Sequence, residues 1–188
     1  MIVKYSILIE NIKDILRILP IKKIQIFNFE ISFLVPTNYL LSTMLFFKNH
    51  TQLQCKILTC ISCVDYPFKS LRFMLVYDLL SLRYNARFKI KIFSHELSSI
   101  ESISSIFSTS FWYECEIWDL FGVFFKNHFD LKRILTDYGF IGYPLRKDFP
   151  LNGFIELRYS ESKSRVVSQL VTFSQEFRVF NFNIPWKT

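Results

Sequence analysis

The four glycines of this 188-residue chain all lie in one stretch, residues 111–159, and this placement constrains the fold more than any other feature. Glycine adopts left-handed backbone at no steric cost, so tight turns are expected where glycines gather. Pro144 and Pro150, in the same stretch, fix their own backbone angles and disfavour helix at the residues before them. We therefore expect special turns here and little such interruption elsewhere. The glycines are Gly122, Gly139, Gly142 and Gly153.

The stretch begins with a predicted helix that ends near Gly122. Its apolar stripe, at helical spacing, is Tyr113, Ile117, Leu120 and Phe124. Glu114, Glu116 and Asp119 are then expected on the flanks of this stripe. Because these acids lie within two turns and beside two tryptophans, they need nearby cations or shifted pKa values. A basic turn at 131–135, a chain reversal at 136–139 and a proline-stiffened loop at 142–150 follow.

The three acids allow two interpretations. As a general acid/base cluster they lack a neighbouring nucleophile, a metal set or a second acid pair, which disfavours catalysis. Alternatively they form charge-assisted hydrogen bonds that lock the helix to the loop. The cations available for this are Arg133, Arg146, Lys147 and Arg158.

Four sequence blocks, in one order, resemble the thirty-kilodalton core subunit family of respiratory complex I. Members of this family are called NADH dehydrogenase subunit nine in mitochondria and NuoC in bacteria. The blocks are WYECEIWDLFG at 112–122, DLKRILTDYGF at 130–140, GYPLRKDFPLNG at 142–153 and IELRY at 155–159. Similarity continues at 64–67, 72–77, 175–178 and 185–186, whereas the first fifty residues match only loosely.

The resemblance implies a non-catalytic core subunit in the peripheral arm of proton-translocating NADH:ubiquinone oxidoreductase, scaffolding the quinone-reducing module. It implies no catalytic, cofactor-binding or metal residue in this chain, because NADH, FMN, the iron–sulfur clusters and ubiquinone belong to other subunits. The implied partners are other complex I subunits, especially the quinone-site subunits, with no nucleic acid and with membrane contact only through the assembled complex. The implied location is the matrix side of the mitochondrial inner membrane, with an organelle-encoded gene.

The resemblance also selects residues that we expect to anchor the chain internally and to partner subunits. The polar anchors are Glu114, Glu116, Asp119, Arg133, Asp137, Arg146, Lys147, Asp148, Glu156 and Arg158. The apolar anchors are Trp112, Trp118, Phe149, Phe177 and Trp186. One departure bears on the acids: Cys115 stands where the family has an arginine that could pair with Asp119 at i+4. Ile141 and Tyr143 likewise replace an acidic residue and a histidine of the family.

The resemblance implies an α+β fold with helices packed on a mostly antiparallel sheet, and the periodicity of the remaining sequence predicts its helices and strands. Residues 1–110 are expected to form this domain, 111–159 the Gly/Pro-containing family segment, and 160–188 an extended C-terminal arm docked on partner subunits. The expected helices cover 7–19, 37–48 (capped by Thr37 and Asn38) and a short piece of 96–109. The expected strands cover 22–28, 30–35, 52–64, 71–81 and 86–93. The inward candidates of the first two strands are Ile24, Ile26, Ile31 and Phe33.

Cysteine spacing offers a competing function, an iron–sulfur carrier. Cys55, Cys60 and Cys63 have plant-type C-x4-C-x2-C spacing, with Cys115 available as a fourth thiolate. This segment, however, is β-branched and contains no glycine or proline to let the sulfurs converge, and strand alternation would put Cys60 on the face opposite the other two. We therefore interpret these cysteines as small apolar residues. His50, His95 and His128 show no ligand or triad spacing.

Charge and composition suggest that partners cover part of the surface. Hydrophobic residues make up 51% of the chain and the net charge is +7, which fits a large core or apolar interfaces. The strand at 86–93 alternates apolar residues with Arg87, Lys89 and Lys91, which predicts a basic outer face. That face could bind RNA, but docking onto an acidic protein surface is favoured because no RNA-binding pattern accompanies it. No apolar run reaches the ~20 residues of a membrane-spanning helix, and no targeting segment is expected.

Overall fold

The structure is a computed structural model that describes residues 18–27, 30–180 and 186. The chain forms two compact units, residues 1–149 and 150–188, each of which is considered by itself. The predicted helix at 7–19 falls outside the described residues except at its last two positions. The domain divisions at 110 and 159 remain a prediction.

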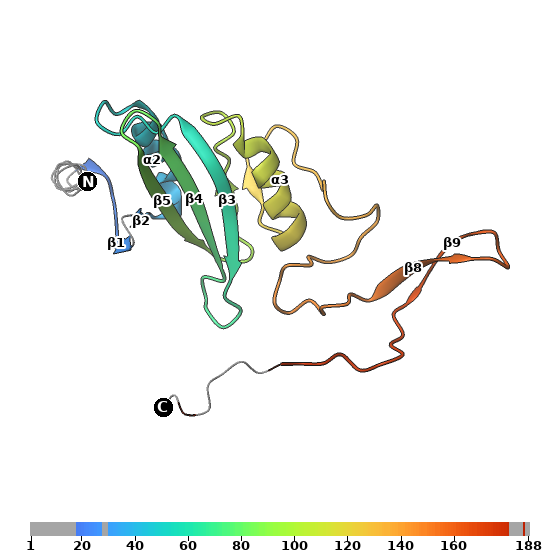
Figure 1. Ribbon diagram of the computed structural model, residues 1–188. Helices are drawn as coiled ribbons and strands as arrows, with labels where there is room; N and C mark the ends of the chain where they lie inside the picture. Colours follow the sequence, from blue (N-terminus) through green and yellow to red (C-terminus); the bar gives the residue numbers. More distant parts are fainter. Residues whose placement is uncertain (1–17, 28–29, 181–185, 187–188) are drawn as a thin grey trace. The chain divides into compact units, whose positions relative to one another are not determined.

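The first unit is built on a five-stranded sheet, as the sequence predicts (Figure 1). Within the described residues β2 and β5 are the one parallel pair of this sheet, and the other neighbours are antiparallel. The mostly antiparallel α+β prediction is therefore confirmed. In spatial order the strands are β1 (Lys23–Phe27), β2 (Glu30–Leu34), β5 (Ala86–Ser94), β4 (Phe73–Ser81) and β3 (Ile57–Asp65).

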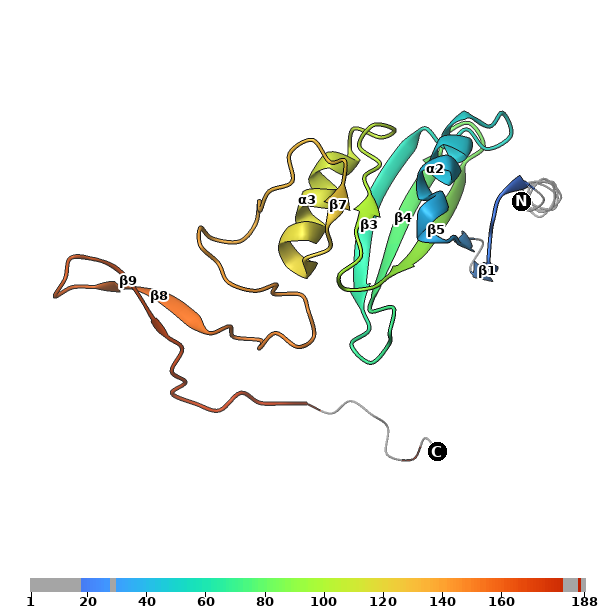
Figure 2. The ribbon, with the colours of Figure 1, turned by 180° about the vertical axis from the view of Figure 1, so that it is seen from behind.

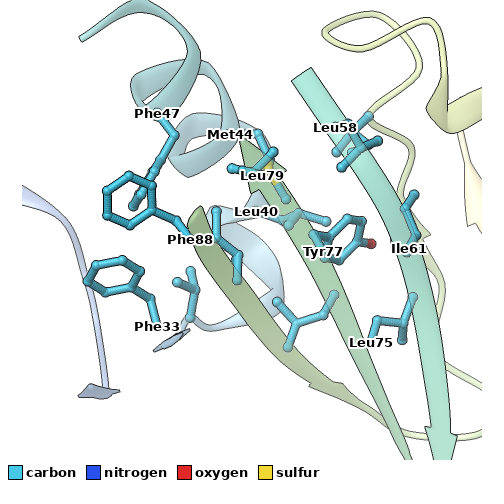
Figure 3. Packing of buried hydrophobic residues seen from close by; sticks show 14 of the residues in the cluster. Phe33, Leu40, Met44, Phe47, Leu58, Ile61, Leu75, Tyr77, Leu79 and Phe88 are labelled. Carbon is cyan, nitrogen blue, oxygen red and sulfur yellow. The ribbon is translucent and has the colours of Figure 1, made fainter. Parts of the chain in front are cut away.

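One face of the sheet is buried by two helices, α2 (Leu40–Asn49) and α3 (Ser110–Phe121). Helix α2 lies behind the strands in Figure 1 and in front of them in Figure 2. Alternation puts every second residue of β4 into this core, from Phe73 to Ser81. Figure 3 shows the aromatic part of the packing, where the ring of Phe47 lies 5.3 Å from that of Phe33 and 5.7 Å from that of Phe88.

Three local predictions are wrong. Thr37 does not cap α2: its hydroxyl donates to the Phe93 carbonyl at 3.0 Å, and a short 3-10 turn η1 (Thr37–Tyr39) precedes the helix. Ile26 is 58% exposed because β1 is an edge strand that extends past the core. The short helix expected within 96–109 is replaced by turns and β6 (Ile100–Glu101), which pairs in parallel with β7 (Phe125–Lys126). The serine-rich sequence there favours turns, because serine hydroxyls compete for the backbone.

A β-bulge in β3 breaks the alternation predicted through 52–64. The register shifts between Leu58 and Cys60, so Leu58 and Ile61 both face the core. The basic outer face of β5 is confirmed, because Phe88, Ile90 and Ile92 are buried while the intervening basic residues point away from the core.

The second unit contains a hairpin that the sequence did not predict, β8 (Ile155–Ser160) and β9 (Arg165–Leu170). Directly paired residues share a face, and one face carries only one polar residue, Ser168. Residues 171–180 have no helix or strand. The apolar members of that face are Ile155, Leu157, Tyr159, Val166 and Leu170.

In the described residues no helix is long and apolar enough to cross a bilayer.

Candidate functional site

The carboxylate of Asp119, near the end of α3, holds the loop that follows β7. Its Oδ2 accepts hydrogen bonds from the backbone nitrogens of Ile134, Leu135 and Thr136 at 3.1, 2.7 and 2.9 Å. Its Oδ1 accepts from the Thr136 hydroxyl at 2.6 Å and lies 3.3 Å from Nη1 of Arg133. We call these contacts the Asp119 clamp. The ion pair to Arg133 matches the predicted helix-to-loop lock.

The environment of Asp119 favours its charged form, although the side chain is fully buried. Burial alone would raise the pKa, but the Thr136 hydroxyl and the three backbone N–H groups outweigh burial, so the pKa of Asp119 is lowered. The guanidinium of Arg133 also donates to the Gly142 carbonyl from both terminal nitrogens at 3.1 Å. The clamp therefore joins α3, the 133–136 turn and the 142–149 loop.

Arg146 fixes the same loop to the end of α3. Its Nε donates to the Phe121 carbonyl at 2.6 Å, and its guanidinium lies 4.5 Å from the ring centroid of Tyr143 and pairs with Glu96. Gly122 ends the helix with φ +74°, and a Cβ there would lie 2.6 Å from the Tyr143 ring. Glycine is therefore required both by the backbone conformation and by the close approach of the loop.

A second polar network ties the 142–149 loop to the sheet. Asp65 at the end of β3 pairs with Arg72 through two contacts of 2.8 and 3.1 Å, and its Oδ2 accepts from the backbone nitrogen of Lys147 at 2.9 Å. Arg72 also reaches Glu96 at 3.1 Å and Asp148 at 2.9 Å. Burial acts to raise the pKa of Asp65, but hydrogen bonds from Arg72 and Lys147 lower it overall.

Glu114 is fully buried, which corrects its predicted place on the helix flank. Its Oε1 accepts from the Ile103 backbone nitrogen at 2.9 Å and its Oε2 from the Ser102 hydroxyl at 2.5 Å. Nε2 of the equally buried His128 lies 3.8 Å from Oε2. The backbone nitrogen of Asp130 donates to Nδ1 of His128 at 3.1 Å. Burial raises the pKa of Glu114 to about 7, although the hydrogen bonds from Ser102 and the Ile103 nitrogen act to lower it.

The stripe predicted for this helix is confirmed at the buried Ile117 and at Tyr113 and Leu120, which are partly buried against the core. The buried positions include Ser110, Glu114, Ile117 and Phe121, and Phe124 lies beyond the helix and is exposed. Cys115 also points inward, with its thiol 3.5 Å from the Asp130 carbonyl. In this chain, therefore, the cation that pairs with Asp119 is Arg133, and position 115 supplies none.

The other predicted anchors lie at separate places. Trp118 packs edge-to-face on Phe124 and Tyr143, and Phe149 stacks at 5.9 Å on Phe140. Asp137 accepts from the Tyr138 nitrogen at 2.8 Å, and within the second unit Glu156 accepts from Gln169 at 2.5 Å. Glu116 is half-buried on α3. The anchors with exposed side chains are Trp112, Asp137, Lys147, Asp148, Arg158, Phe177 and Trp186.

Sequence reasoning missed several residues of these networks. Asp65 and Arg72 lie in segments that share similarity with the family, at 64–67 and 72–77, and that signal could have selected them. The others carry no local signal, because their partners are backbone groups or distant side chains. They are Glu96, Ser102, His128 and Thr136.

The four cysteines are free thiols, with Cys55 and Cys115 buried and Cys60 and Cys63 half-buried. Within the described residues no group of three or more His, Cys, Asp or Glu side chains could hold a metal ion. Burial raises the pKa of Cys55 and of Cys63 to about 12. Cys60 donates to Asp78 at 3.2 Å, and its pKa is raised by burial and by that carboxylate.

Taken together, the buried carboxylates bind backbone amides and cations of their own chain. Asp65, Asp119 and Glu114 each accept at least one backbone N–H from a segment distant in sequence. Groups held in this way position loops, and the arrangement can present the 133–149 surface in one conformation.

Comparison with known proteins finds relatives over most of the chain. The family described as "Respiratory-chain NADH dehydrogenase, 30 Kd subunit" matches residues 33–155. NADH-ubiquinone oxidoreductase subunit 9 of Reclinomonas americana is 52% identical over 152 residues, which are 81% of this chain and 74% of that protein. NADH dehydrogenase (ubiquinone) iron-sulfur protein 3 of Solanum tuberosum is 50% identical over 151 residues, 80% of each chain. Among solved structures, a chain of the membrane-bound sulfane sulfur reductase, an archaeal respiratory membrane complex, is similar with a TM-score of 0.65 and 25% identity, covering 76% of this chain and 85% of that one.

Proposed function

Because this chain belongs to the family of the respiratory-chain NADH dehydrogenase 30 Kd subunit, we propose that it works as a core subunit of proton-translocating NADH:ubiquinone oxidoreductase and contributes structure, not chemistry. Electron transfer from NADH to ubiquinone is the activity of the whole assembly. This subunit scaffolds the quinone-reducing module by holding its neighbours in fixed positions.

The observation that carries the scaffolding role is the Asp119 clamp. A fully buried carboxylate that accepts three backbone N–H groups is fixed in position, because any movement would leave several polar groups without partners. The Asp65–Arg72 pair fixes the other end of the same loop region. Such double anchorage suits a surface that must keep one shape against a partner.

The proposed partners are other subunits of the complex, especially those of the quinone site in its peripheral arm. Two features support this proposal. The 129–145 region carries large apolar side chains in exposed positions, and such patches mark interfaces. The hairpin of the second unit has an apolar face that the described residues of that unit leave uncovered, and a lone two-stranded hairpin is at best marginally stable in water. The exposed side chains of the loop region include Phe129, Leu135, Tyr138 and Ile141.

No cofactor is proposed for this chain, although relatives carry "iron-sulfur protein" in their names. The burial of Cys55 and Cys115 and the placement of Cys60 and Cys63 on the regular strand β3 support this assignment. NADH, FMN, iron–sulfur clusters and ubiquinone are assigned to the other subunits. We place the assembly at the mitochondrial inner membrane, with this chain on its matrix side and reaching the membrane only through the other subunits.

Native electrophoresis of the source membranes, probed for this chain, tests the proposal. The chain is expected to migrate with a very large assembly that oxidises NADH in the gel. Migration as a free protein would contradict membership of the complex. A visible absorbance with stoichiometric iron in the isolated chain would contradict the cofactor assignment.

A further inference from the structure

The face of the five-stranded sheet opposite the helices is left uncovered by the described residues. Helix α2 packs on the buried face, and α3 contributes to the same core, where the ring of Phe121 lies 6.4 Å from that of Phe73. Figures 1 and 2 show the strands of this sheet from its two sides, with α2 on one side only. We refer to the uncovered side as the outer face.

The strand register assembles a groove on the outer face. Gln25 of β1 pairs with Ser32 of β2, Ser32 with Lys89 of β5, and Lys91 with Val76 of β4. These side chains, with those of neighbouring positions, line a cavity of about 710 Å³. A second cavity of about 350 Å³ shares Gln25, Ser32 and Lys91 with the first, so the two form one continuous groove.

The groove carries an excess of positive charge. Lys89 pairs with Glu30 at 2.5 Å, and these two charges neutralise each other. Among the described residues Lys91 donates to the neutral amide oxygen of Gln25 at 3.2 Å, and Lys23 lines the second cavity from an exposed position. Two ammonium groups are thus left for an anionic partner.

The groove also has an apolar part. Met74 and Val76 of β4 line it, together with Phe27 of the edge strand, which pairs with Glu30 and so lies on the outer face. Such a channel accepts aliphatic side chains of an extended peptide, while its acidic residues approach Lys23 and Lys91. A flat lipid surface does not fit a concave groove, and the nuclease arm of the experiment below distinguishes a nucleic acid from an acidic peptide.

We propose that the outer face is a docking groove for an extended acidic segment of another protein. This inference rests on the proposed function, because the partner is a neighbouring subunit of the same assembly. Charge complementarity selects an acidic segment as the occupant of the groove. The ion pairs with Lys23 and Lys91 then fix the position of that segment along the sheet.

Amine labelling of the intact assembly tests this groove. Acetylation with an N-hydroxysuccinimide ester is measured by mass spectrometry, with the exposed Lys56 and Lys69 of the same chain as internal references. Lys23 and Lys91 should react about tenfold more slowly than the references in the assembly, as expected for amines in a desolvated ion pair, and equally fast after denaturation. Equal reactivity in an assembly that still contains the chain would overturn the groove proposal and leave the proposed function standing. Absence of the chain from the assembly would instead contradict the proposed function.

Carbodiimide cross-linking then identifies the occupant. Zero-length links should join Lys23 or Lys91 to an Asp or Glu of a different subunit, and K23E/K91E should remove them while K56E leaves them unchanged. Links to Glu10 or Asp14 of the same chain, or loss of protection after nuclease treatment or delipidation, would overturn the proposal, because the occupant would then be the chain itself, a nucleic acid or a lipid.

Discussion

Asp119 of helix α3 and Leu135 are joined by a hydrogen bond of 2.7 Å between a buried carboxylate oxygen and a backbone nitrogen, across sixteen residues of chain. Asn at position 119 would keep the size of the side chain. Its NH2 group, however, is itself a donor and would face N–H groups that need an acceptor. We expect D119N to lower the free energy of unfolding by about 3 kcal/mol, because it removes a charge from a buried network and leaves N–H groups unsatisfied.

Urea unfolding of the purified full-length chain, followed by tryptophan fluorescence, measures this loss. D137N is the matched control, because Asp137 lies in the same loop, is exposed, and accepts only from the adjacent Tyr138 nitrogen. Equal midpoints for D119N and the unsubstituted chain would show that the Asp119 clamp does not hold the loop.

Sheet strands were predictable from the sequence because their side chains alternate. In β5 every second residue from Phe88 is apolar and buried, and the intervening basic residues face outward, so sequence pattern and burial coincide. The turn that joins β8 and β9, in contrast, has no signal in the sequence. Its loop contains no glycine, and Ser164 takes the positive φ of 48° that glycine or asparagine would usually mark. The residue types therefore do not indicate this turn.

The candidate site was predictable as a segment but not in its contacts. The predicted apolar stripe puts Glu114 on a flank, whereas its partners, Ser102 and the Ile103 nitrogen, make burial possible. Backbone donors such as those of the 134–136 turn depend on loop geometry, which residue spacing does not specify. Opposite charges are visible in the sequence, so Arg133 is among the four expected cations, but spacing does not specify which acid it meets.

The raised pKa of Glu114 predicts a pH dependence of stability. Folding raises this pKa from 4.5 to about 7, so between these pH values the folded chain holds a proton that the unfolded chain has released. The contribution of Glu114 to the free energy of unfolding is then fully present below about pH 4.5 and lost as pH rises through 7, by on the order of 3 kcal/mol. Above pH 7 this contribution is constant.

The E114Q variant separates this effect from other titrations. Glutamine stays neutral, so the difference in unfolding free energy between E114Q and the unsubstituted chain should change with pH between 4.5 and 7 and be flat above that range. E116Q, which alters a half-buried residue of the same helix, should run parallel to the unsubstituted chain. A constant offset for E114Q across the whole range would mean that Glu114 keeps an ordinary pKa when folded.

Two glycines with nearly the same backbone conformation provide a test of the close approach at the end of α3. Gly122 and Gly139 have φ of +74° and +72°, but a Cβ at Gly139 meets nothing within 4 Å. G139A should therefore cost only the left-handed backbone strain, about 1 kcal/mol. G122A adds overlap with the Tyr143 ring and should cost about 1–3 kcal/mol more. Indistinguishable urea midpoints for the two variants would mean that the loop does not pack against the helix end in solution.

Arg146 tests whether the anchored loop matters for assembly. R146A removes the hydrogen bond to the Phe121 carbonyl and the ion pair with Glu96, so the 142–149 loop loses one of its links to α3. We expect a lower yield of assembled, quinone-reducing complex on native gels, with normal specific activity in the fraction that assembles, because the residue positions a surface and touches no reacting group. K147A is the control: Lys147 contacts Asp65 through its backbone nitrogen, which alanine retains. Normal assembly of R146A would remove Arg146 from the anchors, whereas normal assembly with lost activity would give it a direct part in quinone reduction.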